Sequence, residues 1–385
     1  MKIVIAPDSY KESLSAKEVA NAIEKGFLHV FPDANIIKVP LADGGEGTVD
    51  SFISAVGGRL ICHSVSGPLG DVADSFFGVL SNQTTAVIEM AAASGLKLIK
   101  SRDRNPCLTT TYGTGELVKA VLDLGIRHII IGLGGSATND GGMGMLQALG
   151  VKFLDSEGIE LKQGGGELGK LARIDLSSCD TRLKETRFQV ICDVDNPLCG
   201  PLGASCFFGP QKGATQELVE LLDDNLARYA HIIHQTTGID VREVKGAGAA
   251  GGMGAAFVGI LKQSLLPGVE VIMEAIGFDK NLADSTLVIT GEGCIDAQTI
   301  CGKAPIGVAK AAKKHGIPVI VIAGSTDVGV EGVYQHGVDA VYSVINSACS
   351  IEDAYKLAQH NTEFVAMNVA KTLALGGSVF DSKRP

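Results

Sequence analysis

Four stretches of the sequence place glycines and carboxylates directly after an apolar segment that has the pattern of a strand. They are residues 7–11, 41–48, 133–142 and 290–299. Ligands of α/β proteins bind at the carboxyl ends of strands, and the bare backbone N–H groups of glycine-rich loops hold phosphate. One acidic glycine loop is typical of an ordinary turn or helix cap. Four of them predict a shared active site.

The carboxylates of these loops need a cation, because a carboxylate beside a phosphate is otherwise repelled. Mg²⁺ is a hard ion that binds one or two carboxylates together with phosphate oxygens. Some of the candidate carboxylates must instead cap helices or orient water. The candidates are Asp43, Glu46, Asp193, Asp195, Glu292 and Asp296.

Lysines in the same kind of loop would supply the positive charge that a transferring phosphoryl group needs. The three candidates are Lys11, Lys212 and Lys303. An exposed lysine is more often a solvated side chain than a ligand-binding group. Lys303 is the strongest candidate, because it follows Gly302 and precedes the expected start of a helix, whose N-terminus attracts anions.

The loop at residues 132–144 has a second interpretation. Residues 132–137 fit G-x-G-x-x-A, the dinucleotide fingerprint, and Asp155 lies about 20 residues further on. The alternative is therefore an NAD(P)-dependent hydroxy acid oxidoreductase. Gly141, Gly142 and Gly144 weaken it, since each costs the following helix about 1 kcal/mol relative to Ala. A non-catalytic metabolite-binding protein is a third hypothesis.

Other nucleotide and hydrolase signatures are absent from the sequence. G-x-x-x-x-G-K-[ST] does not occur, because Ala297 stands where the first glycine should be and Ala304 where the hydroxyl should be. The protein-kinase motifs H-R-D and D-F-G and the hydrolase elbow G-x-S-x-G do not occur either. The chemistry must therefore be sought in the acidic glycine loops.

The composition is that of a globular protein with small-molecule partners. The length of 385 residues predicts about two domains. A net charge of -10 argues against nucleic acid or an anionic membrane as the main partner. Nine cysteines without a C-x-x-C pair fit reduced intracellular thiols rather than a disulfide framework or a metal site. We expect a cytoplasmic protein, because no apolar stretch reaches about 18 residues. A monomer and a homodimer are both compatible with the sequence.

Strands and helices alternate cleanly at both ends of the chain, whereas residues 59–98 have the short alternating runs of an antiparallel or mixed meander. The simplest topology joins residues 1–62 and 280–385 into one doubly wound α/β domain with a parallel sheet, and inserts residues 63–279 as a mixed α/β domain. The active site is then expected in the cleft between the two. The strand at 128–131 fits either domain, and residues 207–213 are expected to form a strand and loop.

Five ordered motifs resemble the glycerate kinase type-1 family, and the resemblance runs essentially from end to end. They are APDSYK with SLSA (6–11, 13–16), PLADGGEGT (40–48), GTGE (113–116), GLGGSATNDGG (132–142) and TGEG with ID and QT (290–293, 295–296, 298–299). The resemblance implies an ATP- and Mg²⁺-dependent kinase that converts D-glycerate to 2-phosphoglycerate in glyoxylate, glucarate or serine-related metabolism. It also implies a flavodoxin-like domain. The chain departs from the usual pattern at Tyr10 (commonly Phe), Glu12 (commonly Gly) and Cys294 (commonly Arg).

The resemblance and the loop chemistry together give each motif an expected role. Asp193 is the expected general base at the glycerate hydroxyl, with Asp43 as the alternative, and Lys303 and Lys11 are expected to neutralise the transferring phosphoryl group. The residues expected to bind nucleotide and phosphate are Gly134, Gly135, Ser136, Thr138, Asn139, Asp140, Gly291, Gly293 and Thr299. Those expected to bind glycerate are Asp8, Ser9, Arg59, Gly44 and Gly45. Those expected to bind Mg²⁺ are Glu292, Asp296 and Glu46.

Overall fold

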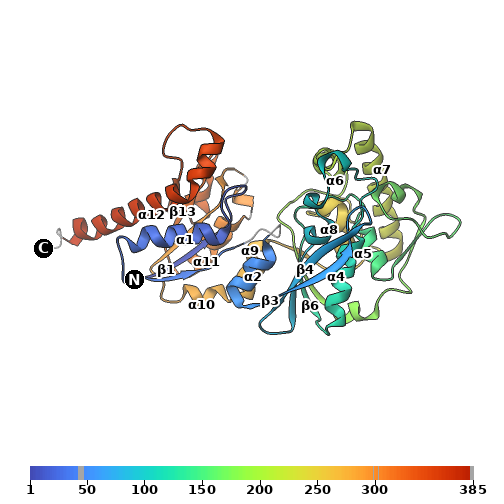
Figure 1. Ribbon diagram of the computed structural model, residues 1–385, viewed down its shortest axis with the longest axis horizontal. Helices are drawn as coiled ribbons and strands as arrows, with labels where there is room; N and C mark the ends of the chain where they lie inside the picture. The colour runs from blue at the N-terminus through green and yellow to red at the C-terminus, as the bar shows by residue number, and fades with distance from the viewer. Residues whose placement is uncertain (42–46, 298, 302, 382–385) are drawn as a thin grey trace. The chain divides into compact units, whose positions relative to one another are not determined.

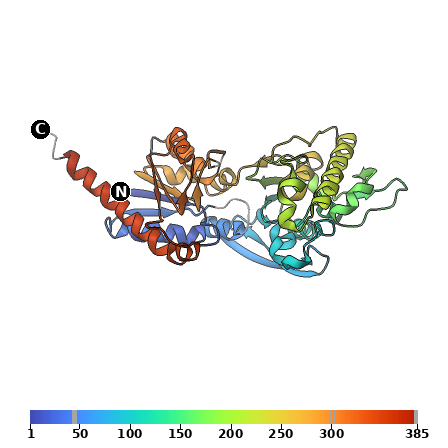
Figure 2. The ribbon, with the colours of Figure 1, turned by 90° about the horizontal axis from the view of Figure 1, so that it is seen from above.

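The computed structural model describes residues 1–41, 47–297, 299–301 and 303–381. The chain divides into two compact units: unit 1 is Met1–Asp43 with Val269–Pro385, and unit 2 is Gly44–Gly268. Both ends of the chain, blue and red in Figures 1 and 2, lie in unit 1, and the middle of the chain forms unit 2.

Unit 1 is built on a five-stranded parallel sheet in the order β15-β13-β11-β1-β2. Counted along this unit, the order is 2-1-3-4-5, the flavodoxin-like arrangement of a doubly wound fold. Its strands are β1 (Lys2–Pro7), β2 (Asn35–Lys38), β11 (Leu287–Gly291), β13 (Val319–Ala323) and β15 (Ala340–Ser343). A short parallel pair, β12 (Cys294–Ile295) and β14 (Ser325–Thr326), extends the ends of β11 and β13.

The sequence explains the helices of unit 1. Ser15 and Glu18 have the spacing of a capping box, and they form one at the start of α1 (Ala16–Leu28). α1 packs along α12 (Ile351–Asp381), and Ser350 caps the latter through Asp353 N at 3.2 Å (Figure 1). The other helices are α9 (Gly268–Ala275), α10 (Phe278–Leu282) and α11 (Ala304–Lys314), with 3-10 turns η6 (Thr299–Cys301) and η7 (Val330–His336).

Unit 2 contains a six-stranded mixed sheet in the order β10-β9-β6-β5-β4-β3. Strands β5, β6, β9 and β10 are parallel, and β4 and β3 are antiparallel neighbours. The strand at 128–131 therefore belongs to this sheet. The strands are β3 (Gly58–Ser66), β4 (Val72–Leu80), β5 (Thr85–Glu89), β6 (His128–Gly132), β9 (Arg187–Ile191) and β10 (Leu265–Leu266), with a separate hairpin of β7 (Lys152–Leu154) and β8 (Arg173–Asp175).

The helices of unit 2 pack around a core that runs from Val65 to Ile260. They are α2 (Thr48–Val56), α3 (Ala91–Ser94), α4 (Tyr112–Asp123), α5 (Met143–Ala148), α6 (Ala204–Phe208), α7 (Gln216–Thr237) and α8 (Ala249–Gly259), with 3-10 turns at Leu96–Leu98, Ser101–Asp103, η3 (Gly165–Lys170), η4 (Thr181–Glu185) and η5 (Pro210–Lys212). None of the helices among the described residues has the length and apolarity needed to cross a membrane.

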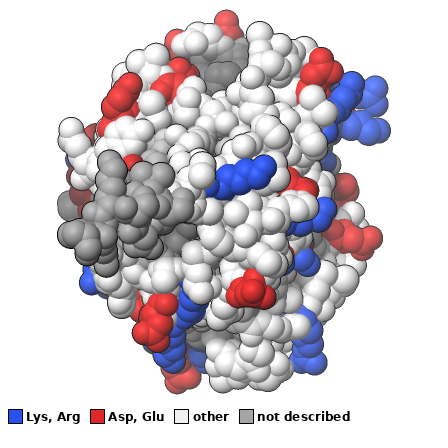
Figure 3. Space-filling view, turned by 90° about the vertical axis from the view of Figure 1, so that its left-hand side faces the viewer, with Lys and Arg blue, Asp and Glu red and all other residues white. Residues whose placement is uncertain are grey.

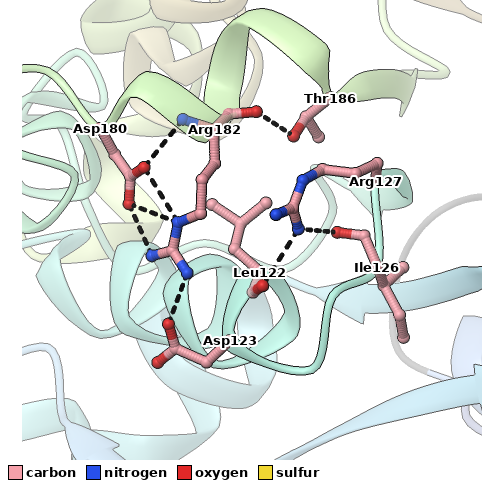
Figure 4. Close-up of polar contacts among 7 residues, drawn as sticks. All are labelled: Leu122, Asp123, Ile126, Arg127, Asp180, Arg182 and Thr186. Atoms are coloured by element: carbon pink, nitrogen blue, oxygen red, sulfur yellow. Dashed lines mark hydrogen bonds and ion pairs between the residues drawn. The ribbon is translucent and has the colours of Figure 1, made fainter.

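An arginine ties the segment before β9 to the end of α4. Arg182 donates to Asp180 Oδ2 at 2.7 Å and to Asp123 Oδ1 at 2.6 Å (Figure 4). Arg127, which precedes β6, donates to the carbonyls of Leu122 and Ile126. These contacts fix the amino ends of β6 and β9, so the loops at their carboxyl ends start from a defined place.

The unit boundaries differ from those expected at residues 62 and 279. β3 pairs with β4 from Gly58 onward, so residues 58–62 belong to the sheet of unit 2. Val269 lies so close to α11 that a Cβ on Gly307 would stand 2.6 Å from Val269 Cγ1, and this places α9 with unit 1. Residues 207–213 were expected as a strand and loop, but they lie in α6 and η5, because Gly209 and Pro210 continue helical turns.

Candidate active site

The first cluster of polar groups lies at the switch point of the unit 1 sheet, between β1 and β11. β2 lies on one side of β1, and β11 lies on the other, so the strand order reverses at this point. Ligands are therefore expected at the carboxyl ends of β1 and β11. Asp8 N donates to Gly291 O at 2.8 Å and joins the two loops. Gly291 cannot carry a side chain, since a Cβ would lie 1.9 Å from Ile322 O.

Glu292, Asp296, Thr299 and Lys303 form a connected group after β11. Thr299 Oγ1 donates to Glu292 Oε1 at 2.6 Å, and Thr299 N donates to Asp296 Oδ1 at 3.1 Å. Lys303 Nζ lies 3.7 Å from both Glu292 Oε2 and Asp296 Oδ1. One lysine thus lies between two carboxylates, and a fully buried threonine hydroxyl orients one of them.

Glu292 is the most perturbed group of this cluster. Burial raises the pKa of its carboxyl, while the Thr299 hydrogen bond and the charges of Lys303 and Lys11 lower it. Asp296 raises the pKa by repulsion. Burial is the largest of these effects, so the pKa of Glu292 lies above its ordinary value. A cation that replaces or joins the lysines would favour the carboxylate form.

The loop after β1 completes the cluster. Asp8 is buried, and its Oδ1 accepts from Ser9 N at 2.6 Å. Lys11 is exposed, and its backbone N lies 3.3 Å from the position of a Cβ on Gly293, so the two loops are in contact. Tyr10 is buried and donates from its hydroxyl to Ile322 O at 2.7 Å.

Two of the three departures from the family pattern have a visible consequence. The extra hydroxyl of Tyr10 finds an acceptor in the neighbouring strand β13, so it is compatible with burial. Glu12 has φ of 65°, a left-handed conformation that favours glycine, and its side chain accepts from Tyr355 at 3.1 Å. Cys294 lies in β12 and is partly buried.

The second group of candidate residues lies in unit 2, in the loop between β6 and α5. Asp140 is fully buried, and its Oδ2 accepts from Thr111 N and Thr111 Oγ1 at 2.8 Å. It also accepts from Gly142 N at 3.1 Å and Gly144 N at 3.2 Å. Burial raises the pKa of Asp140, and these hydrogen bonds lower it by a smaller amount. Asp140 therefore orients the loop and does not face a ligand.

The N-terminus of α5 is already satisfied by protein groups. Met143 N donates to Asp140 O at 2.9 Å, and Met145 N donates to Thr111 Oγ1 at 2.9 Å. Gly142 and Gly144 donate to the Asp140 carboxylate. A dinucleotide pyrophosphate would need these N–H groups free, so the geometry gives no support to the oxidoreductase interpretation of residues 132–137.

Available N–H groups lie earlier in the same loop. Among the described residues, the backbone N–H groups of Gly134, Gly135 and Ser136 have no hydrogen-bond acceptor. Gly135 is exposed with φ of 75°, and Gly134 is partly exposed. Three successive N–H groups beside a left-handed glycine form the kind of concavity that binds an anion.

Lys212 lies directly under this part of the loop. Its Nζ donates to Ser136 Oγ at 2.8 Å and to Thr138 O at 2.7 Å. The side chain is 2% exposed, and burial lowers its pKa to about 7. The charge of Asp140 raises the pKa, but by less than burial lowers it. Thr138 and Asn139 are fully buried, and Asn139 Nδ2 donates to Ser205 Oγ at 3.0 Å. These two side chains support the loop from inside.

Comparison with known proteins decides the family. The model of the glycerate kinase family matches residues 3–374. The chain belongs to the glycerate kinase family. It is 52% identical over 380 residues to "Glycerate kinase" of Bacillus subtilis (strain 168), covering 99% of this chain and 100% of that protein. It is 54% identical over 378 residues to "Glycerate 2-kinase" of Escherichia coli (strain K12), covering 98% and 99%.

A solved structure supports the same assignment. The crystal structure assigned as glycerate kinase 2 of Salmonella typhimurium LT2 has a TM-score of 0.87 and 53% sequence identity, and covers 98% of this chain and 99% of that one. The expected α/β class with parallel sheets is confirmed. The protein is therefore an enzyme of the kinase class.

Two other sequence-predicted site residues of this glycerate kinase family member lie at opposite edges of the unit 2 sheet. Asp193 follows β9, is exposed, and accepts from Gly268 N at 2.8 Å through Oδ1. Arg59 is exposed in β3, paired with Val79. Arg59 therefore lies at the amino ends of β5 and β6, whereas the loop of residues 133–142 leaves the carboxyl end of β6. Asp43, Gly44, Gly45 and Glu46 lie outside the described residues.

Two buried side chains, Lys212 and Glu89, hold backbone segments in place to an extent that the sequence did not indicate. Lys212 was one of three candidate lysines, and its position between Gly209 and Gly213 was the only local signal. Glu89 had none: it ends β5, is buried, and accepts from Val49 N at 2.8 Å near the start of α2. The burial of each depends on segments far away in the chain, which no local pattern reports.

A Mg²⁺ ion would fit the donor set of unit 1. Glu292 and Asp296 share one lysine and supply two carboxylates, the number that Mg²⁺ usually takes from protein when phosphate oxygens complete its shell. Within the described ranges, no group of three or more His, Cys, Asp or Glu side chains is arranged to hold a metal by itself. The set thus suits an ion that arrives with a phosphate ligand.

Proposed function

We propose that this enzyme transfers the terminal phosphoryl group of ATP to D-glycerate and produces 2-phosphoglycerate and ADP. The observation that carries the proposal is the Lys303 ammonium, 3.7 Å from both Glu292 and Asp296 at the switch point of the unit 1 sheet. Phosphoryl transfer requires a cation that neutralises the phosphoryl charge and carboxylates that hold Mg²⁺, both beside a loop that can bind phosphate. The names of the Bacillus subtilis and Escherichia coli relatives support glycerate as the acceptor, and the second supports the 2-position.

Unit 1 supplies the groups for charge neutralisation. Lys303 and Lys11 stabilise the negative charge that spreads over the transferring phosphoryl oxygens, a role worth about 10³–10⁵ in rate for a well-placed cation. Glu292 and Asp296, with Glu46, would hold Mg²⁺, which bridges phosphate oxygens and neutralises their charge when bound. Thr299 holds Glu292 in place, and Gly291 and Gly293 let the loops approach each other.

The remaining roles are proposed for three further sets of residues. The N–H groups of Gly134, Gly135 and Ser136 bind nucleotide phosphates, with Thr138, Asn139 and Asp140 as their internal support. The glycerate carboxylate and hydroxyls are bound by the loop of Asp8 and Ser9, together with Gly44, Gly45 and Arg59. Asp193 accepts the hydroxyl proton, with Asp43 as the alternative, and contributes about 10²–10⁴ in rate.

Incubation of the purified enzyme with ATP, MgCl₂ and D-glycerate tests the activity, with ADP formation as the readout. ADP must form in proportion to glycerate and must not form with L-glycerate or without Mg²⁺. Phosphorus NMR of the product gives the site of transfer. Phosphate on C2 couples to one proton and gives a doublet, whereas phosphate on C3 couples to two protons and gives a triplet. A triplet would contradict the 2-phosphoglycerate assignment.

A further inference from the structure

Lys212 is a buried lysine that the proposed chemistry does not use directly. It ends η5 and is followed by Gly213, whose φ is 94° and whose Cβ would lie 2.4 Å from Arg104 O. Only glycine fits there, so the backbone turns sharply and sends the lysine inward. At 2% exposure the ammonium cannot meet a ligand in this conformation. Any effect on a ligand must pass through the groups that it contacts.

The contacts of Lys212 are concentrated on one short part of the β6–α5 loop. The ammonium donates to Ser136 Oγ at 2.8 Å and to Thr138 O at 2.7 Å. Ser136 is the last of the three residues whose backbone N–H has no acceptor among the described residues. Ser136 is 7% exposed, so the lysine contacts the loop through a nearly buried hydroxyl. A buried ammonium needs such acceptors, because an unpaired charge in a dry site is costly.

A second contact ties the same segment to the same loop. Ser205, in α6, accepts from Asn139 Nδ2 at 3.0 Å. The α6–η5 segment, residues 204–212, therefore holds the loop through Lys212 at Ser136 and Thr138 and through Ser205 at Asn139. Gly251 also packs against the loop, so closely that its Cβ would lie 1.9 Å from Thr138 O. The loop is thus clamped by two segments that are distant from it in the sequence.

We propose that Lys212 is a positioning residue that holds Gly134, Gly135 and Ser136 in the conformation that binds the phosphates of ATP, and that it acts through the Ser136 hydroxyl. This inference rests on the proposed phosphate-binding role of the loop. Lys212 is not a catalytic residue, because it does not reach a ligand.

The charges around Lys212 agree with a positioning role. Asp140 is the buried acid whose charge favours the protonated lysine, and Tyr229, whose pKa is raised by burial and by Asp140, faces the same acid. Arg104 lies on the adjoining segment and donates to Gln211 O at 3.1 Å. Lys212 therefore belongs to a fixed network rather than to a solvated surface.

The test compares Lys212→Met, Ser136→Ala and the double variant with wild type in steady-state kinetics. Met keeps the length of the side chain and removes the donor. We expect Lys212→Met to raise the KM for MgATP about tenfold or more, with the KM for D-glycerate unchanged. The double variant should be no worse than the poorer single variant, because both substitutions break one contact. Lys152→Met, at an exposed position of β7, is the matched control.

Several results would overturn the inference. Lys212→Met could match the Lys152→Met control, it could raise both KM values equally, or its effect could multiply with that of Ser136→Ala, as for independent sites. If Lys212→Met does not fold, Ser205→Ala decides, since it loosens the same clamp without touching the buried charge. A raised KM for MgATP in that variant supports the clamp, and an unchanged KM overturns it.

The inference and the proposed activity can fail separately. If the wild type forms no ADP with D-glycerate, the proposed function fails, and calorimetric titration with MgATP then tests the loop alone. A Kd for MgATP about tenfold higher in Lys212→Met than in wild type still supports the positioning role. Equal Kd values, or a wild type that does not bind MgATP, overturn it.

Discussion

Thr299 and Glu292 are joined by a 2.6 Å hydrogen bond from the threonine hydroxyl to Oε1 of the carboxylate. The threonine is fully buried and the glutamate is 7% exposed. The other glutamate oxygen, Oε2, faces Lys303 at 3.7 Å. The threonine hydroxyl thus fixes one glutamate oxygen, and the other oxygen faces the lysine ammonium. Substitution of the threonine therefore tests whether the orientation of Glu292 matters for activity.

Replacement of Thr299 by Val should lower kcat/KM for glycerate phosphorylation about 10–100-fold, the usual effect of losing a group that orients a ligand-binding carboxylate. Thr299→Ser keeps the hydroxyl and should stay near wild type. Initial rates over a range of Mg²⁺ concentrations measure the effect, and Thr299→Val should need more Mg²⁺. Equal activity of the Val and Ser variants would show that the hydrogen bond has no functional role.

Replacement of Lys303 by Ala should lower kcat by about 10³-fold or more, because it removes the cation proposed to stabilise the transferring phosphoryl group. Lys310→Ala, on the exposed side of the same helix α11, is the control for a general loss of positive charge. Single-turnover measurement of ADP formation separates the chemical step from product release. A nearly normal kcat for both Lys303→Ala and Lys11→Ala would remove these lysines from the mechanism.

Replacement of Gly291 by Ala should destabilise unit 1, because the new Cβ would lie 1.9 Å from Ile322 O in the centre of a parallel sheet. We expect a loss of about 3 kcal/mol or more in the free energy of unfolding, as for other severe overpacking. Gly332→Ala is the control, since its Cβ would meet Ile300 Cγ2 at an ordinary 3.5 Å. Urea denaturation followed by circular dichroism measures both, and a wild-type midpoint for Gly291→Ala would refute the expectation.

The buried lysine predicts a specific dependence of stability on pH. Burial lowers the pKa of Lys212 from 10.5 to about 7, so the folded chain releases a proton near pH 7 that the unfolded chain keeps to near 10.5. Between these values the unfolded state binds more protons, and this lysine's contribution to stability rises with pH.

Comparison of the wild type with Lys212→Met isolates that contribution from other titrating groups. From pH 7 to 9 the wild type should gain, relative to the variant, on the order of 2 kcal/mol in the free energy of unfolding. Denaturation of both proteins at several pH values gives the difference. Parallel curves would mean that Lys212 keeps an ordinary pKa in the folded protein.

Much of the local structure was predictable from the sequence. The capping box of Ser15 and Glu18, the strand Val319–Ala323 and the start of α12 after Ser350 all follow from short-range patterns, and each is confirmed. The helical spacing of apolar residues after Ser350 predicts that Ile351 and Leu357 face inward. That prediction is wrong, since the two residues are 66% and 49% exposed. Helical periodicity marks a face, but only the packing of α1 along α12 decides how far that face is covered.

The acidic glycine loops, the α/β class and the family could be predicted from the sequence, because turn chemistry, periodicity and motif order are local properties. Which loop groups are available to a ligand depends on the tertiary structure. Asp140 is saturated by four hydrogen bonds, whereas Gly134 and Gly135 keep N–H groups without acceptors among the described residues. The lysine that supports them is 76 residues from Ser136 in the chain. Burial and pairing of polar groups depend on such long-range contacts, which no stretch of sequence contains.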